Sequence, residues 1–178
     1  DLLKSGKCYA YKSENLYKGV LPYRREQEKY WLSTDPFTIA EDIARVFARR
    51  KRDPLRYVRV NESGDFHSSE CVKKLIQIAE ILPEISFYTY THRKDLIRSG
   101  MKFPKNLTIN CSNFHRKGMN CYSIEPRVRV KSLKAEFLRA RQQIRDLRGR
   151  LSATCPGDCA KCTLCKVPHG NTVWVPLH

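Results

Sequence analysis

Strand and helix patterns alternate between residues 55 and 113, and this alternation limits the folds open to the chain. The strand-like segments are rich in β-branched and aromatic side chains and span residues 55–60, 85–92 and 106–113. A helical pattern over 68–82 separates the first two, and a shorter one over 93–100 separates the next two. Strands joined through helices form βαβ units with parallel strands. The sequence predicts a single α/β domain over residues 1–178, with a parallel sheet that forms a partial barrel or stays open.

Two further helices are expected before this alternation. The stretch 21–33 has a proline in its first turn, where the missing N–H costs little. Asp35 and Pro36 then mark a helix start, with Asp35 as N-cap. The helix that follows carries an apolar face at helical spacing, made of Phe37, Ala40, Ile43, Ala44 and Phe47. Residues 1–20 give no clear prediction.

Residues 127–151 predict a long, basic, amphipathic helix. Its apolar stripe has heptad-like spacing and consists of Leu133, Phe137, Ala140, Ile144, Leu147 and Leu151. The stripe docks on the sheet in one interpretation and forms a homodimer interface over 133–151 in the other. In both cases the arginines face outward.

Four of the chain's eight cysteines lie within eleven residues, in the C-terminal segment 152–178. Cys155, Cys159, Cys162 and Cys165 have spacings typical of thiolates that converge on one centre, and they predict a 4Fe–4S cluster, with zinc as the alternative. Three of them with one distant cysteine would also complete a ligand set. Cys8 is the first such candidate, and Cys121 or Cys111 comes next. Cys71 sits at an apolar helix position and is expected in the core.

The chain is strongly basic: it has 34 Lys and Arg against 18 Asp and Glu, and a formal net charge of +16. Such an excess favours nucleic acid as a partner. The expected phosphate contacts are Arg49, Arg50, Lys51, Arg52, Arg141, Arg145 and Arg148. Tyr57 and Trp31 are either stacking residues or core. The sequence contains no membrane span or signal peptide pattern, so a cytoplasmic location is expected.

A polar rim is expected where the parallel strands end, because ligands gather at the carboxyl ends of such strands. Its members are Glu62, Asp65, His67, His92 and Ser112. They either line an active site or are ordinary turn and capping residues. No catalytic triad, phosphate-binding glycine loop or H-E-x-x-H motif accompanies them.

Several stretches together resemble one known family. They are CYA at 8–10, VRVNESGDF at 58–66, LPEISFYTYTHR at 82–93, and CPGDCAKCTLC with the following PHG at 155–170. These resemble the "gene product 88" family of bacteriophage and prophage proteins. The resemblance implies a phage origin and supports cluster binding, but it implies no particular reaction. Related phage families with a CYA motif look like remote relatives of radical S-adenosylmethionine barrels.

Three hypotheses follow. The first is a phage-encoded iron–sulfur protein that binds nucleic acid through its basic surface. The second is a radical-type or redox enzyme; Cys155, Cys159 and Cys162 resemble the C-x3-C-x2-C signature of radical S-adenosylmethionine enzymes, although the motif lies late in the chain and a fourth cysteine follows. The third is an interaction protein with a structural cluster or zinc.

Overall fold

The computed structural model describes residues 9–49, 57–129, 153–155, 162–170 and 172–177. Three helices come first: α1 (Tyr9–Leu16), α2 (Val20–Ser33) and α3 (Pro36–Arg49). A βαβ unit follows, formed by β1 (Tyr57–Arg59), α4 (Ser69–Ile81) and β2 (Ser86–Thr91). The remaining strands are β3 (Leu107–Ser112), β4 (Asn120–Arg129), β5 (Ala153–Thr154) and β6 (Thr172–Leu177).

The described strands form one six-stranded sheet in the order β1-β2-β3-β4-β6-β5. All five pairings between neighbours are parallel. The predicted α/β class, with a parallel sheet and a βαβ unit, is therefore confirmed. Because β1 and β5 are the two ends of this order, the described sheet is open rather than closed into a barrel.

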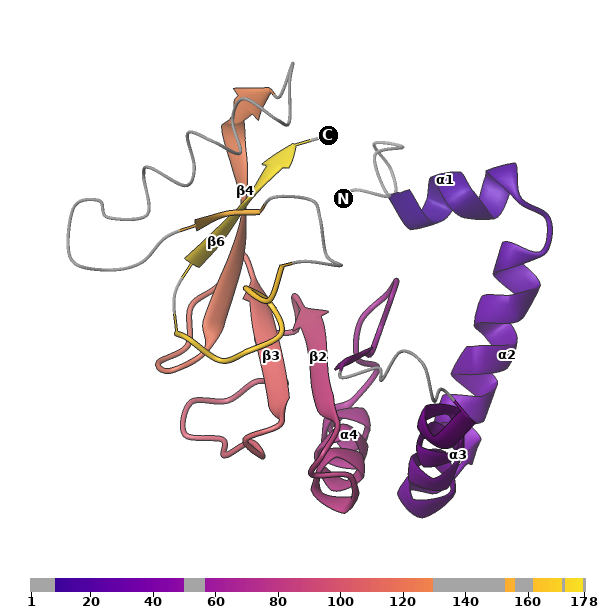
Figure 1. Ribbon diagram of the computed structural model, residues 1–178. Coiled ribbons are helices and arrows are strands. Elements are labelled where there is room, and N and C mark those ends of the chain that lie inside the picture. Colours follow the sequence, from indigo (N-terminus) through magenta and orange to yellow (C-terminus); the bar gives the residue numbers. More distant parts are fainter. Residues whose placement is uncertain (1–8, 50–56, 130–152, 156–161, 171, 178) are drawn as a thin grey trace.

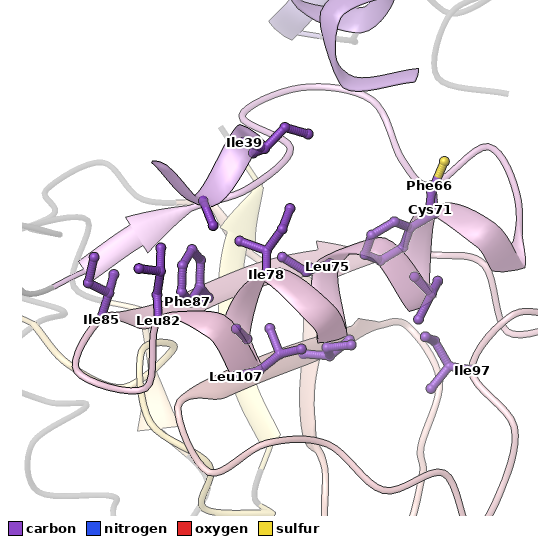
Figure 2. Close-up of a cluster of buried hydrophobic side chains, with 14 of the residues drawn as sticks. Ile39, Phe66, Cys71, Leu75, Ile78, Leu82, Ile85, Phe87, Ile97 and Leu107 are labelled. Carbon is purple, nitrogen blue, oxygen red and sulfur yellow. The ribbon is translucent and has the colours of Figure 1, made fainter. Parts of the chain in front are cut away.

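The hydrophobic core lies between one face of the sheet and α4, with α3 packed beside α4 (Figure 1). Figure 2 shows Leu75 and Ile78 of α4 gathered with Phe87 of β2 and Leu107 of β3. Each fully buried Leu, Ile or Phe contributes roughly 1.5–3 kcal/mol by leaving water. Cys71 is 5% exposed and belongs to this core, as the sequence predicted.

Helices α1 and α2 lie on the far side of α4 from β4 and β6 (Figure 1). Helix α2 has no buried side chain, so apolar burial contributes little to its position. Its C-terminal end is instead fixed by Lys74 of α4, whose Nζ donates to the carbonyls of Trp31 at 2.6 Å and Thr34 at 2.7 Å. These carbonyls are among those that a helix end leaves without partners, and a cation there also suits the helix dipole.

The predicted start of α3 is confirmed, but one member of its apolar face is not. Asp35 Oδ1 accepts hydrogen bonds from the backbone N–H groups of Phe37 at 2.9 Å and Thr38 at 3.0 Å, as an N-cap does. The side chain of Phe37, however, is 68% exposed, whereas Ile39 and Ala40 are buried. Phe37 lies in the first turn of α3 and is not among the residues packed on the core.

Two predicted helices are corrected. Residues 93–100 form turns instead of a helix, because the Arg93 side chain donates to the backbone carbonyls of Phe66 and His67 and holds a single short turn in place. So short a segment gains too few helical hydrogen bonds to form a stable helix. Residues 127–129 lie in β4, so the basic helix expected over 127–151 does not begin there. Its remaining residues, including the stripe over 133–151, lie outside the described residues.

Helix α1 and strands β4, β5 and β6 were not expected from the sequence. Among the described helices, none combines the length and apolar character that a membrane span requires.

Candidate metal centre

The sheet has two chemically different faces because side chains alternate along each strand. The face toward α4 carries apolar and small residues: Val58, Phe87, Thr89, Thr91, Leu107, Ile109, Cys111 and Cys121. The opposite face is polar and aromatic. We call it the tyrosine face, and its residues are Tyr57, Arg59, Ser86, Tyr88, Tyr90, Thr108, Asn110, Ser112, Asn120 and Tyr122.

Residues 162–170, which include Cys162 and Cys165, lie against the tyrosine face and are held there by buried amides. Asn110 Nδ2 donates to the carbonyl of Cys165 at 2.9 Å and to that of Thr89 in β2 at 3.0 Å. Thr108 Oγ1 adds a hydrogen bond to the carbonyl of Lys166 at 3.2 Å. The backbone around Cys165 is therefore tied to β3.

Asn120 at the start of β4 holds the end of the same segment. Its Nδ2 donates to Val167 O at 2.9 Å and to Asn110 Oδ1 at 3.1 Å. Its Oδ1 accepts from the N–H groups of His169 at 2.8 Å and Gly170 at 3.1 Å. Asn110 is 0% and Asn120 1% exposed, so these bonds are made away from water.

The first and last cysteines of the run meet one pair of tyrosine rings. The phenol of Tyr122 donates to Cys155 Sγ at 3.5 Å, and that of Tyr90 is hydrogen-bonded to Cys165. The two rings lie edge to face with centroids 4.9 Å apart. Burial, with the neighbouring Cys165, raises the pKa of Tyr90 well above its ordinary value, so this phenol keeps its proton. Cys155 and Cys165, ten residues apart in sequence, thus return to one place.

Apart from Cys71 in the core, the cysteines of the chain fall into three groups. Cys155, Cys162 and Cys165 are half-buried, and of these Cys155 and Cys165 lie at the tyrosine face. Cys8 and Cys159 lie outside the described residues. Cys111 and Cys121 are buried on the helix face, so the sheet separates them from the cysteine run and they are poor candidates for the fourth ligand. Within the described part of the chain, no group of three His, Cys, Asp or Glu residues is placed to hold a metal ion.

His169 belongs to the same segment, and its ring is oriented by a backbone contact. Its Nε2 lies 2.8 Å from the carbonyl of Leu164, which makes Nε2 the protonated nitrogen. Burial lowers the pKa of His169, so the imidazole is neutral at neutral pH. The sulfur-rich segment therefore carries no histidine charge.

Most residues of the predicted rim have partners within the protein. Arg24 of α2 pairs with Glu62 at 3.0 Å, and Glu28 of α2 contacts His67 Nε2 at 2.5 Å. Asp65 accepts hydrogen bonds from Thr91 Oγ1 at 2.5 Å, from the His92 N–H at 2.6 Å and from the Phe66 N–H at 2.8 Å. These contacts link the ends of β1 and β2 to each other and to α2. Ser112 lies apart from them, 8% exposed on the tyrosine face.

Of the residues expected to contact nucleic acid, the structure describes one. Arg49 is the last residue of α3 and is exposed. The other six lie outside the described residues: Arg50, Lys51, Arg52, Arg141, Arg145 and Arg148.

The residues that anchor the cysteine segment were not expected from the sequence. Asn110 and Asn120 are polar residues inside strands, and a buried asparagine in a strand needs partners for its whole carboxamide. Asn110 follows Ile109 within an otherwise buried strand, which was the available signal. Tyr88 and Tyr90 alternate with buried residues in β2 and so mark the second face of the sheet.

The two faces predict different thiol reactivities. Burial raises the pKa of Cys111 to about 12, because the thiolate is disfavoured away from water. At pH 8 only about one molecule in 10,000 then carries the Cys111 thiolate that attacks iodoacetamide. We expect Cys111 to stay unmodified in the folded protein up to about pH 10 and to react in urea, as read by peptide mass spectrometry. The raised pKa also means that folding stability falls as the pH rises from about 9 toward 12.

The half-buried thiol of Cys162 serves as the internal comparison in the metal-free protein. Equal rates of Cys111 labelling in the folded protein and in urea would show that the helix face does not bury this thiol.

A model for the family described as gene product 88 matches residues 4–172. No curated protein and no solved structure matches the chain. The matched residues include α1 to α4, β1 to β5, both anchoring asparagines and all four cysteines of the C-terminal run. Because the match covers almost the whole sequence, the chain belongs to the gene product 88 family, a family of phage proteins.

Proposed function

We propose that this phage protein binds a metal centre, an iron–sulfur cluster, through Cys155, Cys159, Cys162 and Cys165. The observation that supports this most is the return of Cys155 and Cys165 to one pair of tyrosine rings. The eleven residues from Cys155 to Cys165 begin and end at this pair of rings, and Cys159 and Cys162 lie between them in the sequence. Steps of two and three residues then allow four thiolates to face a common centre.

The donor set suits a metal that prefers sulfur. A 4Fe–4S cluster held by these residues would exchange single electrons or act as a structural crosslink. The phenols of Tyr90 and Tyr122 point hydrogen-bond donors at two of the sulfurs, and such bonds stabilise negative charge on a thiolate. Asn110 and Thr108 keep the backbone at Cys165 and Lys166 in place without using a side chain of the cysteine run.

The identity of the fourth ligand separates two versions of this proposal. Ligation by Cys155 and Cys165 together with the middle pair gives a closed centre for electron transfer or structure. Ligation by only Cys155, Cys159 and Cys162 leaves one iron open, which is what a radical S-adenosylmethionine enzyme needs. The anchoring of Cys165 by Asn110 and Tyr90 favours the closed version. Cys8 is the alternative fourth ligand, and zinc in a four-thiolate site is the alternative metal.

The test is the metal and sulfide content of protein purified without oxygen, read together with its visible absorption spectrum. We expect iron and acid-labile sulfide in equal amounts, and loss of most of both when Cys155, Cys159, Cys162 or Cys165 is changed singly to Ser. Cys71→Ala is the matched control. Because Cys71 lies in the core, this variant should keep its metal.

If the protein contains zinc and no sulfide, the site is a structural zinc site and not a cluster. Unchanged metal content in all four serine variants would contradict the proposal itself. Retention in Cys165→Ser alone, with loss in the other three and in Cys8→Ser, would move the fourth ligand to Cys8.

We also propose that the basic surface contacts nucleic acid, through Arg49, Arg50, Lys51 and Arg52 and through Arg141, Arg145 and Arg148. The net charge of +16 and the exposure of Arg49 at the end of α3 support this. Neutralising phosphates releases bound counterions, so affinity should fall by orders of magnitude between about 50 and 200 mM salt. A gel-shift titration checks this, and absence of any binding at the lowest salt concentration would contradict it.

A further inference from the structure

The tyrosine face extends beyond the cysteine segment onto β1 and β2, where aromatic rings and cations alternate. Tyr57, Tyr88 and Tyr90 are half-buried there, and Arg59 is exposed. The rings of Tyr88 and Tyr90 lie edge to face with centroids 6.2 Å apart. The face therefore presents a row of rings at the edge of the sheet, since β1 is the first strand in the described order.

Two cations lie over these rings. The Arg59 guanidinium carbon is 5.1 Å from the centroid of the Tyr90 ring, and Lys166 Nζ is 4.8 Å from that of Tyr57. Contacts at this distance are attractive because the ring face carries partial negative charge. Arg24, Arg45 and Arg93 are used differently, since they pair with carboxylates at 2.7–2.8 Å.

Among the described residues of the face, the formal charges have one sign. None of the residues that make up the tyrosine face, and none in 162–170, is Asp or Glu. A ligand that fits here carries negative charge to meet Arg59 and Lys166, and flat rings to meet the tyrosines. Single-stranded nucleic acid has both, with phosphates along its backbone and unpaired bases that stack on aromatic side chains. In a duplex the bases are already stacked on one another.

We propose that single-stranded nucleic acid binds across the tyrosine face, with bases against Tyr57 and its neighbouring rings and phosphates against Arg59 and Lys166. This inference rests on the proposed contact with nucleic acid and gives it a strand type and a face of the sheet. Lys166 directly follows Cys165, and Tyr90 bonds to Cys165, so the bound strand lies beside the cysteine run.

The experiment measures fluorescence anisotropy of a labelled oligothymidine of about 12 nucleotides, a length within the range that one such sheet surface covers. A duplex of the same length is the comparison, and both are titrated at low salt. The parent protein should prefer the single strand. Tyr57→Ala combined with Arg59→Ala should weaken that binding by roughly tenfold to a hundredfold, from the loss of one stacked base and one phosphate contact.

The matched control is Tyr23→Ala combined with Arg25→Ala, which changes the same residue types at exposed positions of α2 and should leave affinity unchanged. Tyr57→Phe should also bind as the parent does, because stacking needs the ring and not the hydroxyl. Arg59→Ala alone, at an exposed position, should reduce the slope of log affinity against log salt by about one. Circular dichroism confirms that each variant is folded.

Equal affinity for single strand and duplex would overturn the inference, as would an equal loss in the two double variants. Binding that is strong but indifferent to Tyr57 and Arg59 would leave the proposed nucleic-acid contact standing and move it to another surface. No binding of either nucleic acid at low salt would remove the nucleic-acid contact together with this inference.

Discussion

Two buried carboxamides determine where the cysteine segment of this protein lies. Asn120 uses both hydrogens and both acceptor positions of its amide, on Asn110, Val167, His169 and Gly170. Asn110 donates its two amide hydrogens to the carbonyls of Thr89 and Cys165. Leaving a buried polar group unpaired costs about 1–3 kcal/mol. The segment 162–170 is thus tied to the centre of the sheet, and with it the cysteine at the end of the run.

The division between the two faces follows from this arrangement. The face toward α4 is filled by apolar side chains, and the thiols of Cys111 and Cys121 on this face and of Cys71 on α4 are buried. The tyrosine face holds the thiols of Cys155 and Cys165, next to phenols and cations. One protein therefore keeps two sets of cysteines in opposite chemical surroundings. The second set has phenols and a lysine beside it, and these suit a charged centre or a polyanion.

Local patterns predicted much of the fold. Asp35 with Pro36 marked the start of α3, and the alternation around 55–113 predicted the parallel strands β1, β2 and β3 and helix α4. Phe37 and the turns at 93–100 were missed because tertiary contacts decide them: α3 packs through Ile39 and Ala40, and Arg93 bonds to the loop after β1. The pairing of β4 with β6 joins residues some fifty positions apart, which no local pattern reports.

The candidate site was predictable in part for a similar reason. The spacing of the cysteines is a local property, so the run itself was found from the sequence. Its docking surface comes from β2, β3 and β4, and only pairing in register brings Tyr90, Asn110 and Asn120 onto one face. The rim residues were also found, but their partners on α2, Arg24 and Glu28, could not be inferred without the fold.

The measurement that tests this account most directly is the metal content of Asn120→Leu compared with Asn106→Leu. Both changes remove a carboxamide, but Asn106 binds the carbonyls at the end of α4 and touches no part of the cysteine segment among the described contacts. We predict that Asn120→Leu keeps the circular dichroism of the folded sheet and loses most of its metal, whereas Asn106→Leu keeps both. Full metal retention in folded Asn120→Leu would contradict the claim that these amides hold the metal-binding segment on the sheet.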